Sequence, residues 1–347
     1  MNAILQVIAW MFAACAKGET PTHDHLGKPL KCAPKSIGRP ALIVQVRADW
    51  PALRAMFRFP AWNSHRICWR CQATQTTFRS CGSTAPWRSQ RCSSDDYMRE
   101  VRAAGCFPAL FVLPWLTVDH VVIDWLHTVD LGILRELHGN ALFELMEEQD
   151  APNMAERCQQ LWQKVEALYK THKPPSKLDY LTLEMFREDA SAPPSLKAKG
   201  GESRYLLPIM YELTQHWRAD AGKRHQYTAG EAIRTLYELQ LLISVVPYDK
   251  VKAAQLCKTF CCLYAALEQE ALAAGRNYAW RCKPKLHMLQ EMVEYAADDW
   301  GSPENFWTYV DESWVGFISK MAQRRGGRIG PNVPATRLLQ AYRAGVC

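Results

Sequence analysis

Apolar positions repeat with helical spacing over most of the second half of the chain. From about residue 119 onward, apolar side chains recur every three to four positions, and proline- or glycine-containing breaks separate the runs. The pattern predicts a mainly helical region with one long helix or two abutting helices from residue 119. Further helices are expected near residues 153–171, 203–217, 228–245, 249–274, 284–298, 303–325 and 334–344.

The N-terminal run from residue 2 to 17 is also apolar with helical spacing. No basic stretch precedes it, which favours a buried amphipathic helix over a signal peptide. No stretch of the chain reaches the roughly 20 apolar residues of a membrane span, so we expect no membrane partner. The face expected to be buried consists of Ile4, Ile8, Met11, Phe12 and Cys15.

A short apolar, β-branched run at residues 41–46 (ALIVQV) predicts a strand. Asp49 follows it, and Trp50-Pro51 is a typical helix start. Asp49 is therefore expected at the C-terminal end of a strand and at the N-cap of a helix. This α/β signature is confined to residues 1–60, and the fold class expected for the whole chain is mainly α with a small α/β remnant.

Charge and cysteine content narrow the class of protein. The net charge of +7 is compatible with a polyanionic partner such as DNA but does not require one. The 13 cysteines are odd in number, and several lie in apolar helical runs, where a free thiol packs like a small hydrophobe. We therefore expect reduced cysteines and a nuclear or cytoplasmic location. The alternative is a secreted Cys-rich helical protein.

A Cys-x-x-Cys pair with an upstream histidine is the best candidate for a metal site. His65, Cys68 and Cys71 lie in an irregular segment, and two thiolates at this spacing can hold one Zn²⁺. A structural zinc site needs four ligands, and free buried cysteines are the alternative interpretation. The residues that could complete the site are Cys81, Cys92 and His127.

Asp124, His127 and Asp130 recur every three residues in DWLHTVDLG, which would place them near one face of a helix. Such a face could bind a metal, relay a proton or cap a neighbouring helix. Because apolar residues flank the group, a buried and locally hydrogen-bonded structural role is favoured from the residues alone.

Near the C-terminus, Asp311 and Glu312 lie off the apolar stripe of their expected helix, and taken alone they indicate a solvated face. Arg324, Arg325 and Arg328 form a small basic patch. It could contact phosphates, or it could simply be the basic end of a helix.

The order of these segments resembles DDE transposases and transposon-derived proteins of the CACTA or Kyakuja–Dileera–Zisupton type. The resemblance spans roughly residues 40–345. It rests on RADWPALRAMFRFPAWNS, then HRICWRC and DWLHTVDLGIL, and finally KPKLHMLQEM and NFWTYVDESWVGF. It implies a ribonuclease-H-like core with a large helical insertion. Three acidic residues of such a core hold two Mg²⁺ or Mn²⁺ ions for DNA strand cleavage and transfer.

By this resemblance Asp49 matches the second catalytic acid and Glu312 the third, with Asp311 as the fallback. The first acid should lie on an earlier strand. Only 48 residues precede Asp49, which leaves no room for that strand and its meander. The core is therefore expected to be incomplete and truncated at its N-terminal side, and the chain to be inactive.

These expectations divide the chain into a partial ribonuclease-H-like segment (1–60), a Cys-rich irregular insert (61–116) and a helical region (117–347), of which 284–325 returns to the core. The expected function is that of a transposase-derived protein that has lost its chemistry. The alternative is a non-enzymatic nucleic-acid- or zinc-binding module.

Overall fold

Two short parallel strands bring distant parts of the chain together. The computed structural model describes residues 2–186 and 193–324. Strand β1 (Val46–Ala48) pairs in parallel with β2 (Val121–Ile123), and Ala48 lies opposite Ile123. Within the described residues these two strands form the sheet. All of β2 is buried, whereas the three residues of β1 are partly exposed, so the sheet lies at the edge of the core.

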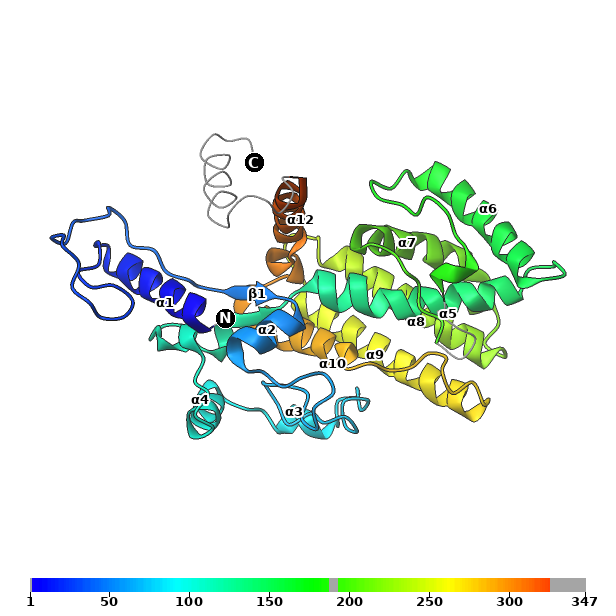
Figure 1. Ribbon diagram of the computed structural model, residues 1–347. Helices are drawn as coiled ribbons and strands as arrows, with labels where there is room; N and C mark the ends of the chain where they lie inside the picture. The colour runs from blue at the N-terminus through cyan, green and yellow to red at the C-terminus, as the bar shows by residue number, and fades with distance from the viewer. Residues whose placement is uncertain (1, 187–192, 325–347) are drawn as a thin grey trace. The chain divides into compact units, whose positions relative to one another are not determined.

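Helices make up most of the remaining structure, which confirms the expected mainly helical fold (Figure 1). The α-helices are Asn2–Lys17 (α1), Trp50–Phe57 (α2), Pro86–Ser89 (α3), Ser94–Ala103 (α4), Leu134–Glu147 (α5), Met154–His172 (α6), Gly200–Leu213 (α7), Arg224–Leu242 (α8), Lys250–Ala273 (α9), Lys285–Gln290 (α10), Ala297–Trp300 (α11) and Tyr309–Arg324 (α12). Segments η3 (Leu126–Ile133) and η6 (Glu291–Ala296) are π-helical. Short 3-10 turns are η1 (Ala109–Val112), η2 (Val118–His120), η4 (Leu183–Met185), η5 (Gln215–Ala219) and η7 (Pro303–Phe306).

The chain forms two compact units, Met1–Trp307 and Thr308–Cys347. In the second unit, α12 begins at Tyr309 and ends at Arg324. A helix was predicted there at residues 303–325. The further helix predicted at 334–344 lies outside the described residues. None of the described helices is both long and apolar enough to cross a membrane.

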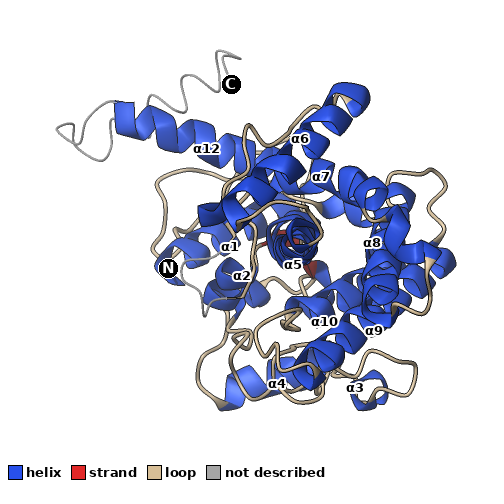
Figure 2. Ribbon diagram, turned by 90° about the vertical axis from the view of Figure 1, so that its right-hand side faces the viewer, coloured by secondary structure: helices blue, strands red, loops and turns tan. Residues whose placement is uncertain are grey.

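The first unit is built around α5, which Figure 2 shows end-on among its neighbours. Helices α6 and α7 pack against α5, and α8 packs against α7 and along α9. Nearly every face of α5 is buried, as expected of a helix at the centre of a core. Its buried His138 donates a 2.9 Å hydrogen bond from Nε2 to the carbonyl of Ser203 in α7. At Gly139 the chain before α7 passes so close that an added Cβ would lie 2.6 Å from the Pro194 carbonyl oxygen.

Helix α1 packs against η1, and the face it buries matches the predicted one only in part. Ile8 and Phe12 pack against the core as predicted, next to Leu5 and Ala9, whereas Ile4 and Met11 are exposed. The run is apolar on several sides, so helical spacing alone did not determine which side would meet η1.

The strand predicted at residues 41–46 shares only Val46 with the observed strand β1 (Val46–Ala48). Val46 is the first paired residue, and Leu42 and Val44 before it are exposed. The reason is the partner, because β2 offers only Val121–Ile123 for pairing.

The prediction of continuous helix from residue 119 was wrong at its start. Val121–Ile123 forms β2, and a π-helical segment follows it before α5 begins. Val121, Val122 and Ile123 are β-branched and fit a buried parallel strand, and pairing with β1 overrides the helical periodicity.

Candidate metal centre

Cys68 and Cys71 lie on a tight turn in the Cys-rich segment. The turn closes through the Ile67 amide, which donates to the Ala73 carbonyl at 2.9 Å, and through an isolated β-bridge between Cys71 and Arg91. The Arg70 amide donates to Cys68 Sγ at 3.3 Å. Both thiols are fully buried. The turn therefore points two sulfur atoms inward, as the Cys-x-x-Cys spacing predicts.

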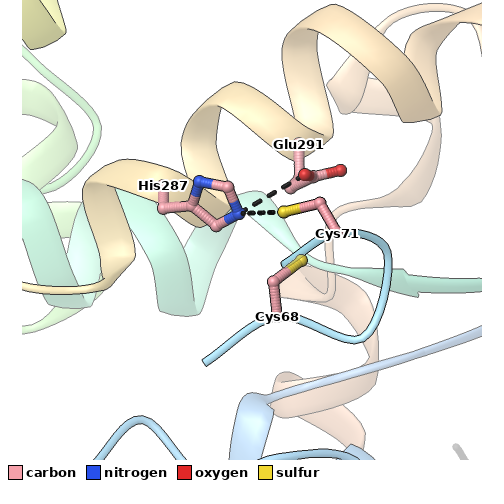
Figure 3. Close-up of side chains that lie close together, drawn as sticks. All are labelled: Cys68, Cys71, His287 and Glu291. Carbon is pink, nitrogen blue, oxygen red and sulfur yellow. Dashed lines mark hydrogen bonds and ion pairs between the residues drawn. The ribbon is translucent and has the colours of Figure 1, made fainter. Parts of the chain in front are cut away.

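His287 and Glu291 face this turn from the junction of α10 and η6. They are four residues apart, so they project from successive turns of the same helical rod toward the sulfur atoms (Figure 3). Cys71 Sγ lies 3.3 Å from His287 Nε2, and His287 Nε2 lies 3.3 Å from Glu291 Oε1. One ligand atom from each of Cys68, Cys71, His287 and Glu291 lies within 4.8 Å of the others.

Two of these distances are close to those of a tetrahedral zinc ion. Bond lengths of about 2.3 Å to sulfur and about 2.1 Å to nitrogen or oxygen place tetrahedral ligand atoms about 3.4–3.8 Å apart. The two separations from His287 Nε2 are each 3.3 Å, and the other pairs lie within 4.8 Å, so the cluster could hold an ion after small side-chain shifts. Two thiolates, an imidazole and a carboxylate are also a ligand set that Zn²⁺ accepts. An ion held by all four side chains would have no open coordination position, which is typical of structural rather than catalytic zinc sites.

Arg91 balances the charge of the cluster. Its guanidinium forms a two-pronged ion pair with Glu291, at 2.6 and 2.8 Å, and lies over the ring of Tyr295, 3.8 Å from its centroid. A divalent ion held by two thiolates, a neutral imidazole and one carboxylate would leave one net negative charge, which Arg91 would neutralise. Arg91 also fixes the orientation of the carboxylate, which is the role of an outer-shell partner in metal sites.

Without a metal ion, the protonation of the four side chains depends on their burial and on the charged groups around them. Burial raises the pKa of the Cys68 thiol well above its usual range. Burial alone would also raise the pKa of Glu291, but hydrogen bonds from His287 and Arg91 lower it below the ordinary value. Burial alone would lower the pKa of His287, yet its contacts with Cys68 and Glu291 raise it to about 9. Metal binding at this site would therefore release protons.

Further contacts hold the Cys-rich segment against the same helix. Trp87 in α3 meets the His287 ring edge-on, with the ring centroids 4.5 Å apart. Arg88 pairs with Glu294 and donates a 2.7 Å hydrogen bond to Gln290. The two parts are thus already joined by packing and ion pairs around the cluster.

Only two of the four predicted metal ligands belong to the cluster. His65 is exposed and lies outside it. His127 also lies outside it and bonds instead to Asp124. Neither Cys81 nor Cys92 completes the set.

The missed ligands are His287 and Glu291. Their spacing in KPKLHMLQE is that of two residues on one helix face. That spacing could have marked them as a pair of ligands on one helix face, but no feature of the nearby sequence shows that they would meet residues 68–71.

The predicted polar face of Asp124, His127 and Asp130 is only partly formed. Both carboxylate oxygens of buried Asp124 accept from His127, one from the backbone amide and one from Nδ1, each at 3.0 Å. Asp130 is also buried and lies 3.9 Å from Arg204 Nη1 in α7. The π-helical turn between them is wider than an α-helical turn, so a spacing of three residues no longer defines one face.

The predicted catalytic residues are distributed over both units. Asp49 follows β1 and caps α2, accepting a 2.7 Å hydrogen bond from the Ala52 amide as expected. Asp311 and Glu312 lie in the first turn of α12, in the second unit. Arg324 is the last residue of α12, and Arg325 and Arg328 lie outside the described residues.

Comparisons of this chain with protein-family models, with curated proteins and with solved structures find no match. Among the described cysteines none forms a disulfide. A functional proposal for this chain therefore depends mainly on the geometry of the cluster.

Proposed function

We propose that the chain is a transposase-derived, zinc-binding protein that keeps a folded scaffold but has lost DNA strand cleavage. In this proposal Cys68, Cys71, His287 and Glu291 hold one Zn²⁺ ion. The ion fastens the Cys-rich segment to the helical region and has no part in catalysis.

The observation that carries the proposal is the convergence of four ligand-type side chains in the core. Buried thiols are common, but here two of them meet an imidazole and a carboxylate, with all the ligand atoms within 4.8 Å. The residues come from segments 216 positions apart in the chain. An ion at this position would therefore cross-link two parts that are far apart in the sequence, in addition to the packing and ion pairs that already join them.

Two features support the transposase-like part of the proposal. The motifs occur in the order that the resemblance requires, and Asp49 follows the partly buried strand β1 at its carboxyl end. Asp124 follows the neighbouring parallel strand at the same edge, directly after the Ala48–Ile123 pair. Carboxyl ends of parallel strands are where α/β proteins place their reactive groups.

The state of these carboxylates supports the loss of cleavage. Asp124 is fully buried and both of its oxygens accept from His127. One oxygen of Asp49 is engaged by the Ala52 amide. A two-metal centre needs several carboxylate oxygens open to the ions, and Asp124 offers none without breaking its contacts with His127.

Metal content tests the proposed zinc binding, and DNA nicking separately tests the proposed loss of cleavage. Protein purified without added metal should contain about one zinc per chain by elemental analysis. Cys68→Ser should lose that zinc, whereas Cys158→Ser, at a buried thiol of α6 outside the cluster, should retain it. A chain without zinc would refute the metal assignment.

With Mg²⁺ or Mn²⁺ and supercoiled plasmid DNA, we expect no nicking above background. Nicking that disappears in Asp49→Asn would show a working catalytic centre and refute the loss of activity. DNA binding measured over a series of salt concentrations would show whether the net positive charge contributes to binding of DNA.

A further inference from the structure

A second polar site lies where the start of α5, the middle of α9 and the segment leading into α10 meet. It is a cavity of about 160 Å³. Four cationic side chains line it, together with one carboxylate, that of Glu136. The four cations are Arg135, Arg281, Lys283 and Lys285.

Most of this positive charge is not balanced by the protein. Lys283 Nζ pairs with Glu136 Oε1 at 2.5 Å. The other three cations have no carboxylate partner among the described residues. Arg135 Nε donates to the Ser195 hydroxyl at 2.7 Å, and Lys285 Nζ donates to the His127 carbonyl at 2.6 Å. With Lys283 and Glu136 cancelling, the cavity has a net charge of about three positive units, which favours an anion.

The cavity also holds two buried polar atoms without partners. The Tyr264 side chain is 2% exposed, and its hydroxyl has no hydrogen-bond partner among the described residues. Glu136 Oε2 is likewise buried without a partner. Such atoms cost free energy unless something occupies the space between them. The Tyr264 hydroxyl can donate a hydrogen bond, whereas the carboxylate oxygen Glu136 Oε2 can only accept one.

The position of Lys285 depends on a glycine. A Cβ added at Gly132 would lie 2.4 Å from Lys285 Cδ and 2.8 Å from its Nζ. The lysine stem therefore lies directly over the backbone of η3. A larger residue at position 132 would push the ammonium group away from the cavity.

We propose that this cavity binds a phosphate group that still carries a proton. The phosphate oxygens would accept from Tyr264, Lys285 and the two arginines, and its remaining P–OH would donate to Glu136 Oε2. Sulfate has the same shape and charge but no proton at neutral pH, so Glu136 would repel it. The same chemistry is offered by inorganic phosphate and by a phosphate monoester, whose second pKa is about 6.

Calorimetric titration of the zinc-loaded protein with inorganic phosphate, sulfate and AMP tests this proposal. We expect phosphate to bind at least tenfold more tightly than sulfate. Tighter binding of AMP than of phosphate at pH 6 would identify a monoester as the source, and the reverse would identify the free ion. Equal affinity for sulfate and phosphate, or no binding of either phosphate compound at millimolar concentration, would overturn the proposal.

Matched variants locate the binding. Tyr264→Phe should weaken phosphate binding about tenfold, the effect of one hydrogen bond to a charged group. Tyr248→Phe removes another buried hydroxyl without a partner, outside the cavity lining, and should bind normally.

Arg281→Ala changes an exposed side chain with little risk to folding and should also weaken binding, whereas exposed Lys252→Ala should not. Equal losses in Arg281→Ala and Lys252→Ala would mean that only general charge attracts the anion. A DNA oligonucleotide without terminal phosphate that competes with phosphate for the cavity would assign it to phosphodiesters instead. Either result would refute the site as proposed.

Discussion

Loss of one sulfur ligand should remove most of the stability that zinc confers. With zinc buffered at about 1,000 times its Kd, binding to the folded state alone stabilises it by about 4 kcal/mol. Loss even of outer-shell partners typically weakens metal sites 10- to 100-fold, so loss of a ligand should raise Kd at least 100-fold. In Cys68→Ser the zinc-dependent stabilisation would then fall to about 1.4 kcal/mol. The difference of about 2.7 kcal/mol corresponds to roughly 4 °C in Tm for a unit of about 300 residues.

The assay is thermal unfolding with a chelator and again with buffered zinc, and the quantity compared is the increment in Tm between the two conditions. Replacing a buried thiol by a hydroxyl has a cost of its own, which appears in both conditions and cancels. Cys158→Ser is the matched control, because its thiol is 3% exposed and donates to the Leu181 carbonyl at 3.6 Å. It should show the full wild-type increment.

Two outcomes would refute the reasoning. If the wild-type Tm does not change between chelator and zinc, the four side chains do not bind the ion. If Cys68→Ser keeps the full increment, zinc binds elsewhere in the chain.

Three further predictions follow from other contacts. Arg91→Met should weaken zinc binding 10- to 100-fold, measured with a competing chelator, because the carboxylate of Glu291 loses the group that orients it; unchanged affinity would remove Arg91 from the site. Gly139→Ala should cost about 2–3 kcal/mol in urea unfolding, since the new Cβ would lie 2.6 Å from backbone atoms that cannot rotate away. Gly82→Ala, which meets nothing within 4 Å, should change stability little, and equal effects would contradict the crowding argument. His225 should make stability pH-dependent: burial alone would lower its pKa, but the ion pair with a glutamate of α5 raises it above 6.5. Its stabilising contribution is complete below pH 6.5 and is lost as pH rises through the raised value, so Tm should fall more steeply over that range in the wild type than in His225→Gln.

The helices were predictable because their signal is local. Periodicity placed α6, α8 and α9 to within a few residues, and the Asp49 cap with the following Trp50-Pro51 located α2. Strand β2 was missed because a run of three residues has no periodicity of its own. Its state is decided by pairing with β1, which lies more than 70 positions earlier in the chain.

The candidate metal site was half predictable for the same reason. Cys68 and Cys71 are close in sequence, and their spacing predicts a turn that brings two sulfur atoms together. His287 and Glu291 look like two ordinary positions on a helix, and only the folded chain brings them to the thiols. Histidines nearer in sequence, His65 and His127, were the natural candidates and proved to lie elsewhere.

The distance between the two halves of the centre has a consequence during protein synthesis. His287 is made 216 residues after Cys71. At about 5–20 residues per second, roughly 10–40 seconds of synthesis separate Cys71 from His287, the next residue of the cluster. During that time the two thiols of the Cys-x-x-Cys turn lack their partners in the cluster, and they can be oxidised or can bind another metal ion. Any product of this gene that stops before residue 287 would keep them in that state permanently.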